Sequence, residues 1–197
     1  VFFGFRRCLR SNTAAQYFGK IRIRQALYKA SNRGGAGEGN ESTVRNMGRS
    51  ATGVKAMRLD EDGDDEVVGM IALTKPEGYD ENAEENGTEE ELYPNMPTIL
   101  VLSEKGVGKR STIGEYRITN RNGKGVKTIN ITEKTGKLVA IKKVTEDEDI
   151  MIINKSGVTI RLAVSDIKKS SRNTQGVKLI DIQKRNDVIS SVCVVEH

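Results

Sequence analysis

The sequence predicts an all-β protein made of propeller-like repeats of about 50 residues each. One observation is an apolar run, Ile99–Leu102, that returns 51 residues later as Ile150–Ile153, each run being followed by a glycine-centred turn. Another is the tripeptide Gly-Val-Lys, which occurs three times, beginning at Gly53, Gly125 and Gly176. Helical periodicity is also poor after residue 40. Together these features indicate repeated β units rather than helices.

Four strands are expected in each repeat, the number in a propeller blade. The β-branched runs at 99–102 and 150–153 are typical of buried strands, and a second strand such as 158–162 leaves the glycine turn. After each Gly-Val-Lys, apolar residues alternate with a period of two, which places them on one sheet face. The aligned pairs are Met57 and Leu59, Ile129 and Ile131, and Ile180 and Ile182. Closing strands are predicted at 67–73, 138–144 and 188–195.

These patterns divide the chain into three predicted blades and two other segments. The blades cover residues 40–73, 98–147 and 148–197. Residues 74–97 form an acidic insert with three prolines, which its composition predicts to be a disordered loop. Residues 1–39 are unassigned: they are basic, and residues 14–30 have the pattern of an amphipathic helix. This segment is either a targeting peptide or sequence foreign to the blades.

Charge is distributed unevenly along the chain. The net charge is +5, from 32 basic and 27 acidic residues, yet residues 60–98 hold fourteen acidic residues and one lysine. The segments on either side are therefore strongly basic. Such asymmetry favours a polyanionic partner beside a solvated acidic loop, the alternative being a charged surface with no ligand.

Composition excludes several classes of site. The one histidine is the last residue, which removes histidine-based triads and most zinc sites. The two cysteines, Cys8 and Cys193, lie at opposite ends and predict no disulfide framework. Residues 106–110 lack the first glycine and the final Ser or Thr of a phosphate-binding loop, and residues 60–66 lack the glycine of a calcium loop. No stretch is long and apolar enough for a membrane helix, so no membrane contact is expected.

Cations recur at matched positions of the repeats, where stacked blades would place them on the same edge. The matched sets are Arg45, Arg117 and Lys168; Arg49, Arg121 and Arg172; and Lys55, Lys127 and Lys178. A positive track of this kind suits a phosphate backbone read with little sequence preference. With their neighbours, the predicted DNA contacts are Arg45, Arg49, Lys55, Lys109, Arg110, Arg117, Arg121, Lys124, Lys127, Arg161, Lys168, Lys169, Arg172 and Lys178.

Several segments resemble the C-terminal domain of bacterial DNA gyrase A, a component of a type IIA topoisomerase. They are Arg45–Lys55, Gly108–Arg110 with Glu115–Arg117, Gly125–Glu133 and Ser171–Lys178. The resemblance extends over residues 40–73 and 98–197, and it implies a β-pinwheel, a propeller-like ring whose blades exchange strands. The three predicted blades resemble the last three of six. The family's wrapping motif, Gln-Arg-Arg-Gly-Gly-Lys-Gly, belongs to the first blade and is absent from this sequence.

The resemblance implies that the chain binds and wraps double-stranded DNA in support of ATP-dependent negative supercoiling. The implied partners are the N-terminal domain of gyrase A and the gyrase B protein in an A2B2 holoenzyme, in the bacterial cytoplasm at the nucleoid. No catalytic residue and no cofactor are expected in this chain, because ATP and Mg²⁺ act on other domains. The alternatives are the equivalent domain of topoisomerase IV, a β-repeat scaffold for an acidic protein, and a stand-alone enzyme, which the lack of clustered catalytic groups disfavours.

Overall fold

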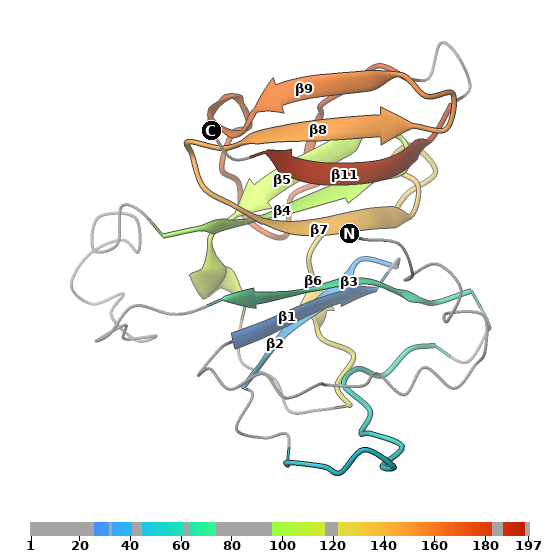
Figure 1. Ribbon diagram of the computed structural model, residues 1–197. Coiled ribbons are helices and arrows are strands. Elements are labelled where there is room, and N and C mark those ends of the chain that lie inside the picture. The colour runs from blue at the N-terminus through green and yellow to red at the C-terminus, as the bar shows by residue number, and fades with distance from the viewer. Residues whose placement is uncertain are drawn as a thin grey trace.

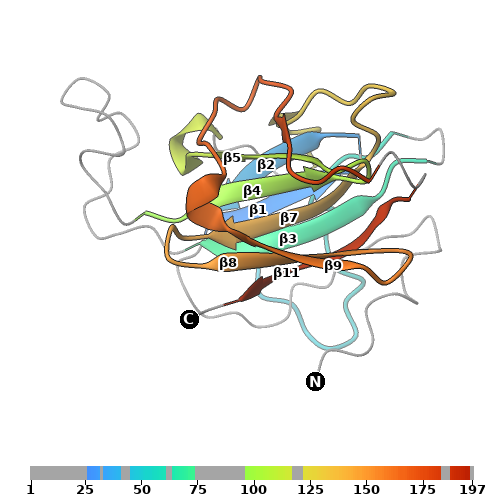
Figure 2. The ribbon, with the colours of Figure 1, turned by 90° about the horizontal axis from the view of Figure 1, so that it is seen from above.

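Three antiparallel sheets make up the computed structural model, which describes residues 26–31, 33–40, 45–60, 64–73, 96–116, 122–182 and 187–195. The sheets stack in sequence order, the third at the top of Figure 1 and the first at the bottom. Seen from above, the strands of successive sheets lie over one another and run in roughly similar directions (Figure 2). The predicted all-β, propeller-type architecture is therefore confirmed.

Each sheet pairs its strands antiparallel. The first has the order β3-β1-β2-β6, with β1 (Ala26–Ser31), β2 (Gly35–Asn40), β3 (Val67–Leu73) and β6 (Val126–Lys127). The second has the order β10-β5-β4-β7, with β4 (Thr98–Ser103), β5 (Val107–Ser111), β7 (Leu138–Val144) and β10 (Val177–Lys178). The third has the order β11-β8-β9, with β8 (Asp149–Asn154), β9 (Thr159–Ala163) and β11 (Ile189–Val195). Single 3₁₀ turns follow two of the strands: η3 (Ile113–Glu115) after β5 and η4 (Val164–Asp166) after β9.

Two strands are exchanged between neighbouring sheets. β6 follows β5 in the chain but pairs with β2 of the first sheet, and β10 follows β9 but pairs with β5 of the second sheet. Both exchanged strands are the Val-Lys of a Gly-Val-Lys tripeptide. Each is followed by the same backbone hydrogen bond, from Thr128 N to Gly34 O and from Leu179 N to Gly106 O, both 2.9 Å long. The repeated tripeptide is thus the segment that joins one sheet to the next.

The tripeptide glycine is required by the closeness of this joint. Gly125 and Gly176 have φ of 82° and 88°, a conformation that other residues rarely adopt. A Cβ added at Gly125 would lie 2.3 Å from the carbonyl oxygen of Ala36, and one at Gly176 would lie 2.8 Å from that of Gly108. A side chain at either position would push the two backbones apart.

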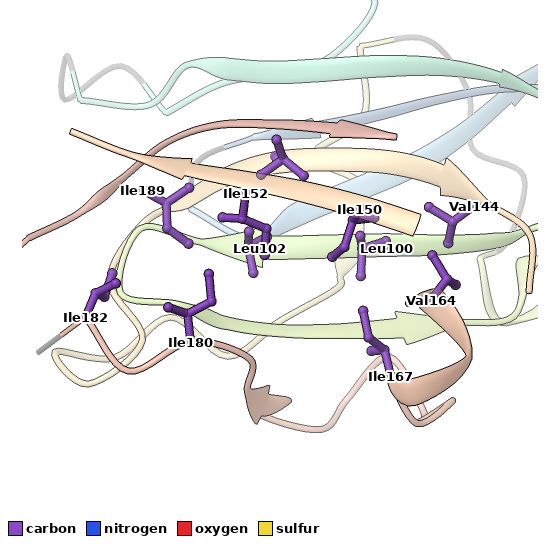
Figure 3. Packing of buried hydrophobic residues seen from close by; sticks show 12 residues of the cluster. Leu100, Leu102, Val144, Ile150, Ile152, Val164, Ile167, Ile180, Ile182 and Ile189 are labelled. Atoms are coloured by element: carbon purple, nitrogen blue, oxygen red, sulfur yellow. The ribbon is translucent and has the colours of Figure 1, made fainter. Parts of the chain in front are cut away.

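The core lies between the sheets, on both faces of β4. Ile99 and Val101 belong to one buried cluster, with Leu138 and Ile141, whereas Leu100 and Leu102 belong to a second. Figure 3 shows the second cluster, in which β4, β8 and the segment after β10 contribute side chains that meet. The continuous apolar run predicted as a buried strand is explained by this two-sided burial. At the junction of the first two sheets, Gly69 of β3 leaves room for Ile141 of β7.

Residues 26–40 correct one sequence expectation. The sequence pattern places them in a segment outside the blades, with a helix over 14–30, but β1 and β2 form a hairpin that completes the first sheet. Residues 35–39 of the glycine-rich run form a strand because β1 and β6 pair with them on their two edges. The remainder of the predicted helix and nearly all of the acidic insert lie outside the described residues.

The other predicted strands are found within one residue of their expected ends, and β3 and β7 match without any difference. The segments after Gly-Val-Lys are the exception, because in the second and third repeats the strand consists of the Val-Lys itself and ends there. Their alternating residues are nevertheless buried as expected: Ile129, Ile180 and Ile182 all lie in the core clusters. Side-chain packing rather than a long ladder holds these segments in place.

Candidate nucleic-acid interface

Lys127 and Lys178 occupy equivalent places on successive sheets. Each is the last residue of an exchanged strand that forms one edge of its sheet, and each has an exposed side chain. The Lys178 ammonium lies 2.7 Å from a carboxylate oxygen of Asp181, and both side chains remain solvent-accessible. Lys55, the third member of the set, is also exposed. The matched cations of two repeats therefore lie on matched edges, as the repeat pattern predicts.

Arg172 reaches from the third repeat to the edge that carries Lys127. Its guanidinium donates to the backbone carbonyl of Lys127 over 3.1 Å, although the two residues are 45 positions apart. Its backbone N–H donates to Glu115 Oε2 (2.5 Å), which also accepts from the hydroxyl of Ser171 (3.0 Å). The structure thus brings Lys127 and Arg172, two of the predicted cations, side by side. The bonds to Glu115 hold the loop that carries Arg172.

The prediction that Lys109 contacts DNA is wrong, because its side chain is buried and holds a loop instead of facing solvent. The residue is 1% exposed. Its ammonium donates to the carbonyls of Ser171 (2.8 Å), Arg172 and Thr174 (3.0 Å). Burial lowers the pKa of Lys109 to about 8, with the charge of Arg172 acting in the same direction and that of Glu115 opposing it. Lys109 therefore positions the loop of Arg172 and cannot contact a phosphate itself.

The prediction that Arg110 contacts DNA is also wrong, because its side chain is buried as well. Its side chain is 4% exposed, Nε donates to the carbonyl of Ile167 (2.5 Å), and an Nη lies 3.3 Å from Glu146 Oε1. Lys169, also predicted to bind DNA, is partly buried and lies 3.0 Å from the same carboxylate oxygen. The hydrogen bond and charge of Lys169, with the charge of Arg110, lower the pKa of Glu146. These two cations are used in joining the second and third repeats.

Two further predicted cations have acidic partners but remain exposed. Arg161 on β9 lies 2.5 Å from Asp149, and Lys124 lies 2.6 Å from Asp60. The hydrogen bond and charge of Lys124, together with the charge of Arg33, lower the pKa of Asp60. An exposed pair such as Lys124 and Asp60 exchanges partners at little cost, so Lys124 can turn to another anion.

Four predicted cations are exposed and have no hydrogen-bond or ion-pair partner within the described ranges: Arg45, Arg49, Lys55 and Lys168. Arg117 and Arg121 lie outside the described residues. Sequence reasoning did not single out Glu115, the acceptor that fixes Arg172. The repeat pattern does contain a signal for this acceptor. An acidic residue, Asp166, stands 51 residues after Glu115, the same spacing as the other repeated positions.

Comparison with known proteins decides the family. A family model described as the DNA gyrase C-terminal domain, beta-propeller, matches residues 40–74, 97–145 and 148–195. The chain belongs to the DNA gyrase C-terminal domain family. Its sequence is 45% identical over 157 residues to the DNA gyrase A protein of Staphylococcus aureus. That match covers 80% of this chain and 15% of the relative, so the chain spans about a seventh of the curated relatives it matches.

Solved structures confirm the fold of this gyrase-family chain. The C-terminal domain of DNA topoisomerase IV matches with a TM-score of 0.71 at 22% identity, over 88% of this chain and 47% of the other. The DNA gyrase A C-terminal domain matches with 0.69 at 23% identity, over 89% and 52%. The ParC C-terminal domain of E. coli matches with 0.57 at 18% identity, over 87% and 62%. The resemblance inferred from the repeat motifs is thereby confirmed.

The described part of the gyrase-family chain lacks two features. It contains no group of three or more His, Cys, Asp or Glu residues arranged to hold a metal ion. Nor does any of its described helices have the length and apolar character needed to cross a bilayer.

Proposed function

We propose that this chain binds duplex DNA along the matched sheet edges that carry Lys127 and Lys178. The observation that carries the proposal is the contact of Arg172 with the backbone of Lys127 (3.1 Å), which groups cations of two repeats at one edge. Cations at regular intervals on a rigid β scaffold suit a phosphate backbone, and such contacts carry little sequence information. The sequence pattern adds Arg117 and Arg121 to the same track.

The wider role rests on family membership and is part of the proposal. Within a gyrase A protein, the chain would wrap DNA and so support ATP-dependent negative supercoiling by the A2B2 enzyme in the bacterial cytoplasm, at the nucleoid. The N-terminal domain of gyrase A and the gyrase B protein are the proposed protein partners. ATP and Mg²⁺ are proposed to act on those other domains, with no cofactor bound by this chain.

Topoisomerase IV is the second candidate, because its C-terminal domain matches this fold as well as the gyrase domain does. The sequence identity of 45% to a gyrase A protein favours gyrase. An assay that distinguishes them replaces the corresponding segment of a gyrase A protein with this chain. Negative supercoiling by the resulting enzyme supports gyrase, whereas relaxation without supercoiling supports topoisomerase IV.

DNA binding is tested by measuring affinity over a salt series with two unrelated duplexes of equal length. We expect the logarithm of affinity to fall linearly with the logarithm of the salt concentration, equally for both duplexes. Six phosphate contacts predict a slope of about −5. Reversing the charge of Lys127, Arg172 and Lys178 should flatten the slope. Lys143→Glu is the matched control, because Lys143 is exposed on β7, at the opposite edge of the second sheet. No binding at low salt would contradict the proposal and favour a scaffold for an acidic protein.

A further inference from the structure

A carboxylate lies close to the cations of the proposed DNA-binding edge. Glu115 ends the 3₁₀ turn η3 and is partly buried. Its Oε2 accepts hydrogen bonds from the backbone N–H of Arg172 (2.5 Å) and from the hydroxyl of Ser171 (3.0 Å), two residues of the third repeat. By charge alone, a carboxylate at this place repels a phosphate backbone and weakens DNA binding. Its contacts point to the opposite effect.

The 3₁₀ turn holds Glu115 between two anchored residues. Ile113 at the start of the turn and Tyr116 just after it are 1% and 2% exposed, and both belong to the first core cluster. Tyr116 N donates to Ile113 O (3.0 Å), and the Tyr116 hydroxyl is hydrogen-bonded to Thr128. The carboxylate of Glu115 is therefore presented to the third repeat from a backbone that has little freedom to move.

The second repeat holds the backbone of Arg172 from two sides. The carbonyl of Arg172 accepts a hydrogen bond from the buried ammonium of Lys109. The N–H of the same residue donates to Glu115. A cation and an anion of one repeat thus bind opposite ends of the same residue of the next repeat. Loss of either contact leaves the backbone of Arg172 held from one side.

The side chain of Arg172 extends from this fixed backbone to the edge strand. Its guanidinium donates to the carbonyl of Lys127 over 3.1 Å, which uses one of the five N–H donors of a guanidinium. Within the described residues, Glu115 bonds to the backbone of Arg172 and to Ser171, and not to this guanidinium. The carboxylate therefore holds the backbone and leaves the cationic group for a phosphate.

Asp60 shows the other way in which an acid can lie beside a cation. Its carboxylate oxygens lie 2.6 Å from Lys124 Nζ and 3.3 Å from an Nη of Arg33, so its contacts are with the charged groups themselves. A phosphate that binds Lys124 must displace this carboxylate. Removal of the Asp60 charge therefore frees a cation, whereas removal of the Glu115 acceptor frees a loop.

We propose that Glu115 is a positioning residue that strengthens DNA binding, because it holds the backbone of Arg172 at the edge that carries Lys127. A backbone that is already fixed reduces the conformational freedom that Arg172 loses when it binds a phosphate. The inference rests on the proposed DNA-binding function. It assigns to an acidic residue of a basic edge an effect opposite in sign to that of its charge.

Two neutral variants of similar size separate the hydrogen bond from the charge. Glu115→Gln removes the negative charge but keeps an oxygen that accepts hydrogen bonds, whereas Glu115→Met removes both. Affinity for duplex DNA is measured over a salt series with the full chain. We expect Glu115→Met to bind more weakly than the parent, by up to about eightfold at about 0.1 M salt, with a slope less steep by about 0.9, the contribution of one phosphate contact.

The comparison between variants decides the proposal. Glu115→Gln should bind DNA more tightly than Glu115→Met, although both remove the same charge. Asp60→Asn is the matched control for charge removal and should bind more tightly than the parent. Equal affinities of the two Glu115 variants, or tighter binding by Glu115→Met than by the parent, would overturn the proposal, because the charge alone would then explain the effect.

The effect should also depend on Arg172. In an Arg172→Gln background, Glu115→Met and Glu115→Gln should bind DNA alike, because the side chain that Glu115 positions is absent. A difference that persists in this background would mean that Glu115→Met loosens the protein generally, and it would overturn the positioning role.

Hydrogen exchange tests the contact in the absence of DNA, so its result does not depend on the proposed function. The Arg172 N–H should be protected in the parent and in Glu115→Gln, and it should exchange faster in Glu115→Met. The N–H of Ile189, which donates to Glu104 O (2.9 Å) between the same two repeats, is the reference and should keep its protection. Unchanged protection of Arg172 in Glu115→Met would overturn the inference. A parent that protects Arg172 but does not bind DNA at low salt would instead contradict the proposed function.

Discussion

Lys109 Nζ donates to the backbone carbonyl of Ser171 over 2.8 Å, and the same ammonium bonds to the carbonyls of Arg172 and Thr174. A buried cation of the second repeat therefore sets the loop by which the third repeat reaches the edge of the first sheet. This contact links the core of the joint to the proposed DNA-binding edge.

Lys109→Met should lower both stability and DNA affinity. Methionine fills a similar volume but removes the ammonium donor from three carbonyls, of which only that of Ser171 keeps bonds within the described part of the chain, from Thr174, and this costs about 1–3 kcal/mol of unfolding free energy. The Arg172 loop loses its anchor, so the salt dependence of DNA binding should become shallower. Urea unfolding and the salt series measure the two effects. Lys143→Met, an exposed change on β7, is the control and should stay within about 0.5 kcal/mol of the parent. Unchanged stability in Lys109→Met would contradict the anchoring role.

The same lysine predicts a pH dependence. Burial lowers the pKa of Lys109 to about 8, from an ordinary value of 10.5. Between these values the unfolded chain binds more protons than the folded chain, so this contribution to the unfolding free energy rises with pH. Below pH 8 the full cost of burying the charge is present. Urea midpoints of the parent and Lys109→Met at about pH 7.5 and about pH 9.5 should therefore diverge in favour of the parent at the higher pH. A difference that does not change with pH would contradict the lowered pKa.

Tyr116 and Thr128 predict a coupled pair of substitutions. The Tyr116 hydroxyl shares a hydrogen bond with that of Thr128, and both residues are almost completely buried, at 2% and 0% exposure. This bond ties η3 to the segment that follows β6, and burial raises the pKa of Tyr116. Tyr116→Phe should cost about 1–2 kcal/mol, because it leaves the threonine hydroxyl buried without this partner.

The double substitution separates the bond from the loss of each hydroxyl. Thr128→Val in the Tyr116→Phe background should cost less than Thr128→Val alone, with a coupling of about 1 kcal/mol in urea unfolding. Additive costs would mean that the shared bond contributes little.

Local pattern predicted the elements of this fold better than their pairing. The run 99–102 is readable as a strand because both of its faces are buried, and the repeated glycines are readable because only glycine fits the joint. The partner of a two-residue strand is not a local property, since β6 and β10 are fixed by sheets that precede them in the chain. The glycine-rich β2 likewise forms through its neighbours and has little strand propensity of its own.

The candidate site shows the same limit. Repeat spacing identified Lys127, Arg172 and Lys178, and the structure brings the first two together. Lys109 and Arg110 carry the same positive charge as these three residues, yet the third repeat packs over both of them and buries them. Burial of a charged residue on a strand depends on what is packed against that strand, and charge patterning alone does not contain this information.

The glycines at the joints between sheets, Gly125 and Gly176, give the sharpest test of strand exchange. Gly125→Ala places a Cβ 2.3 Å from the carbonyl oxygen of Ala36 and also strains a residue with φ of 82°. Two controls separate these effects. Gly157→Ala has the same strain at φ of 88° but open space around the new Cβ, and Gly48→Ala has open space without a strained φ.

We expect Gly48→Ala to be nearly neutral, and Gly157→Ala to cost about 1–2 kcal/mol of unfolding free energy, the usual cost of a left-handed alanine. Gly125→Ala should cost clearly more, because the backbones of β2 and the segment before β6 must separate to admit the methyl group. Hydrogen exchange should then show loss of protection at Thr128, whose N–H bonds to Gly34 O. If Gly125→Ala and Gly157→Ala cost the same, conformational strain alone explains the glycine, and the close approach of the two repeats contributes nothing to its selection.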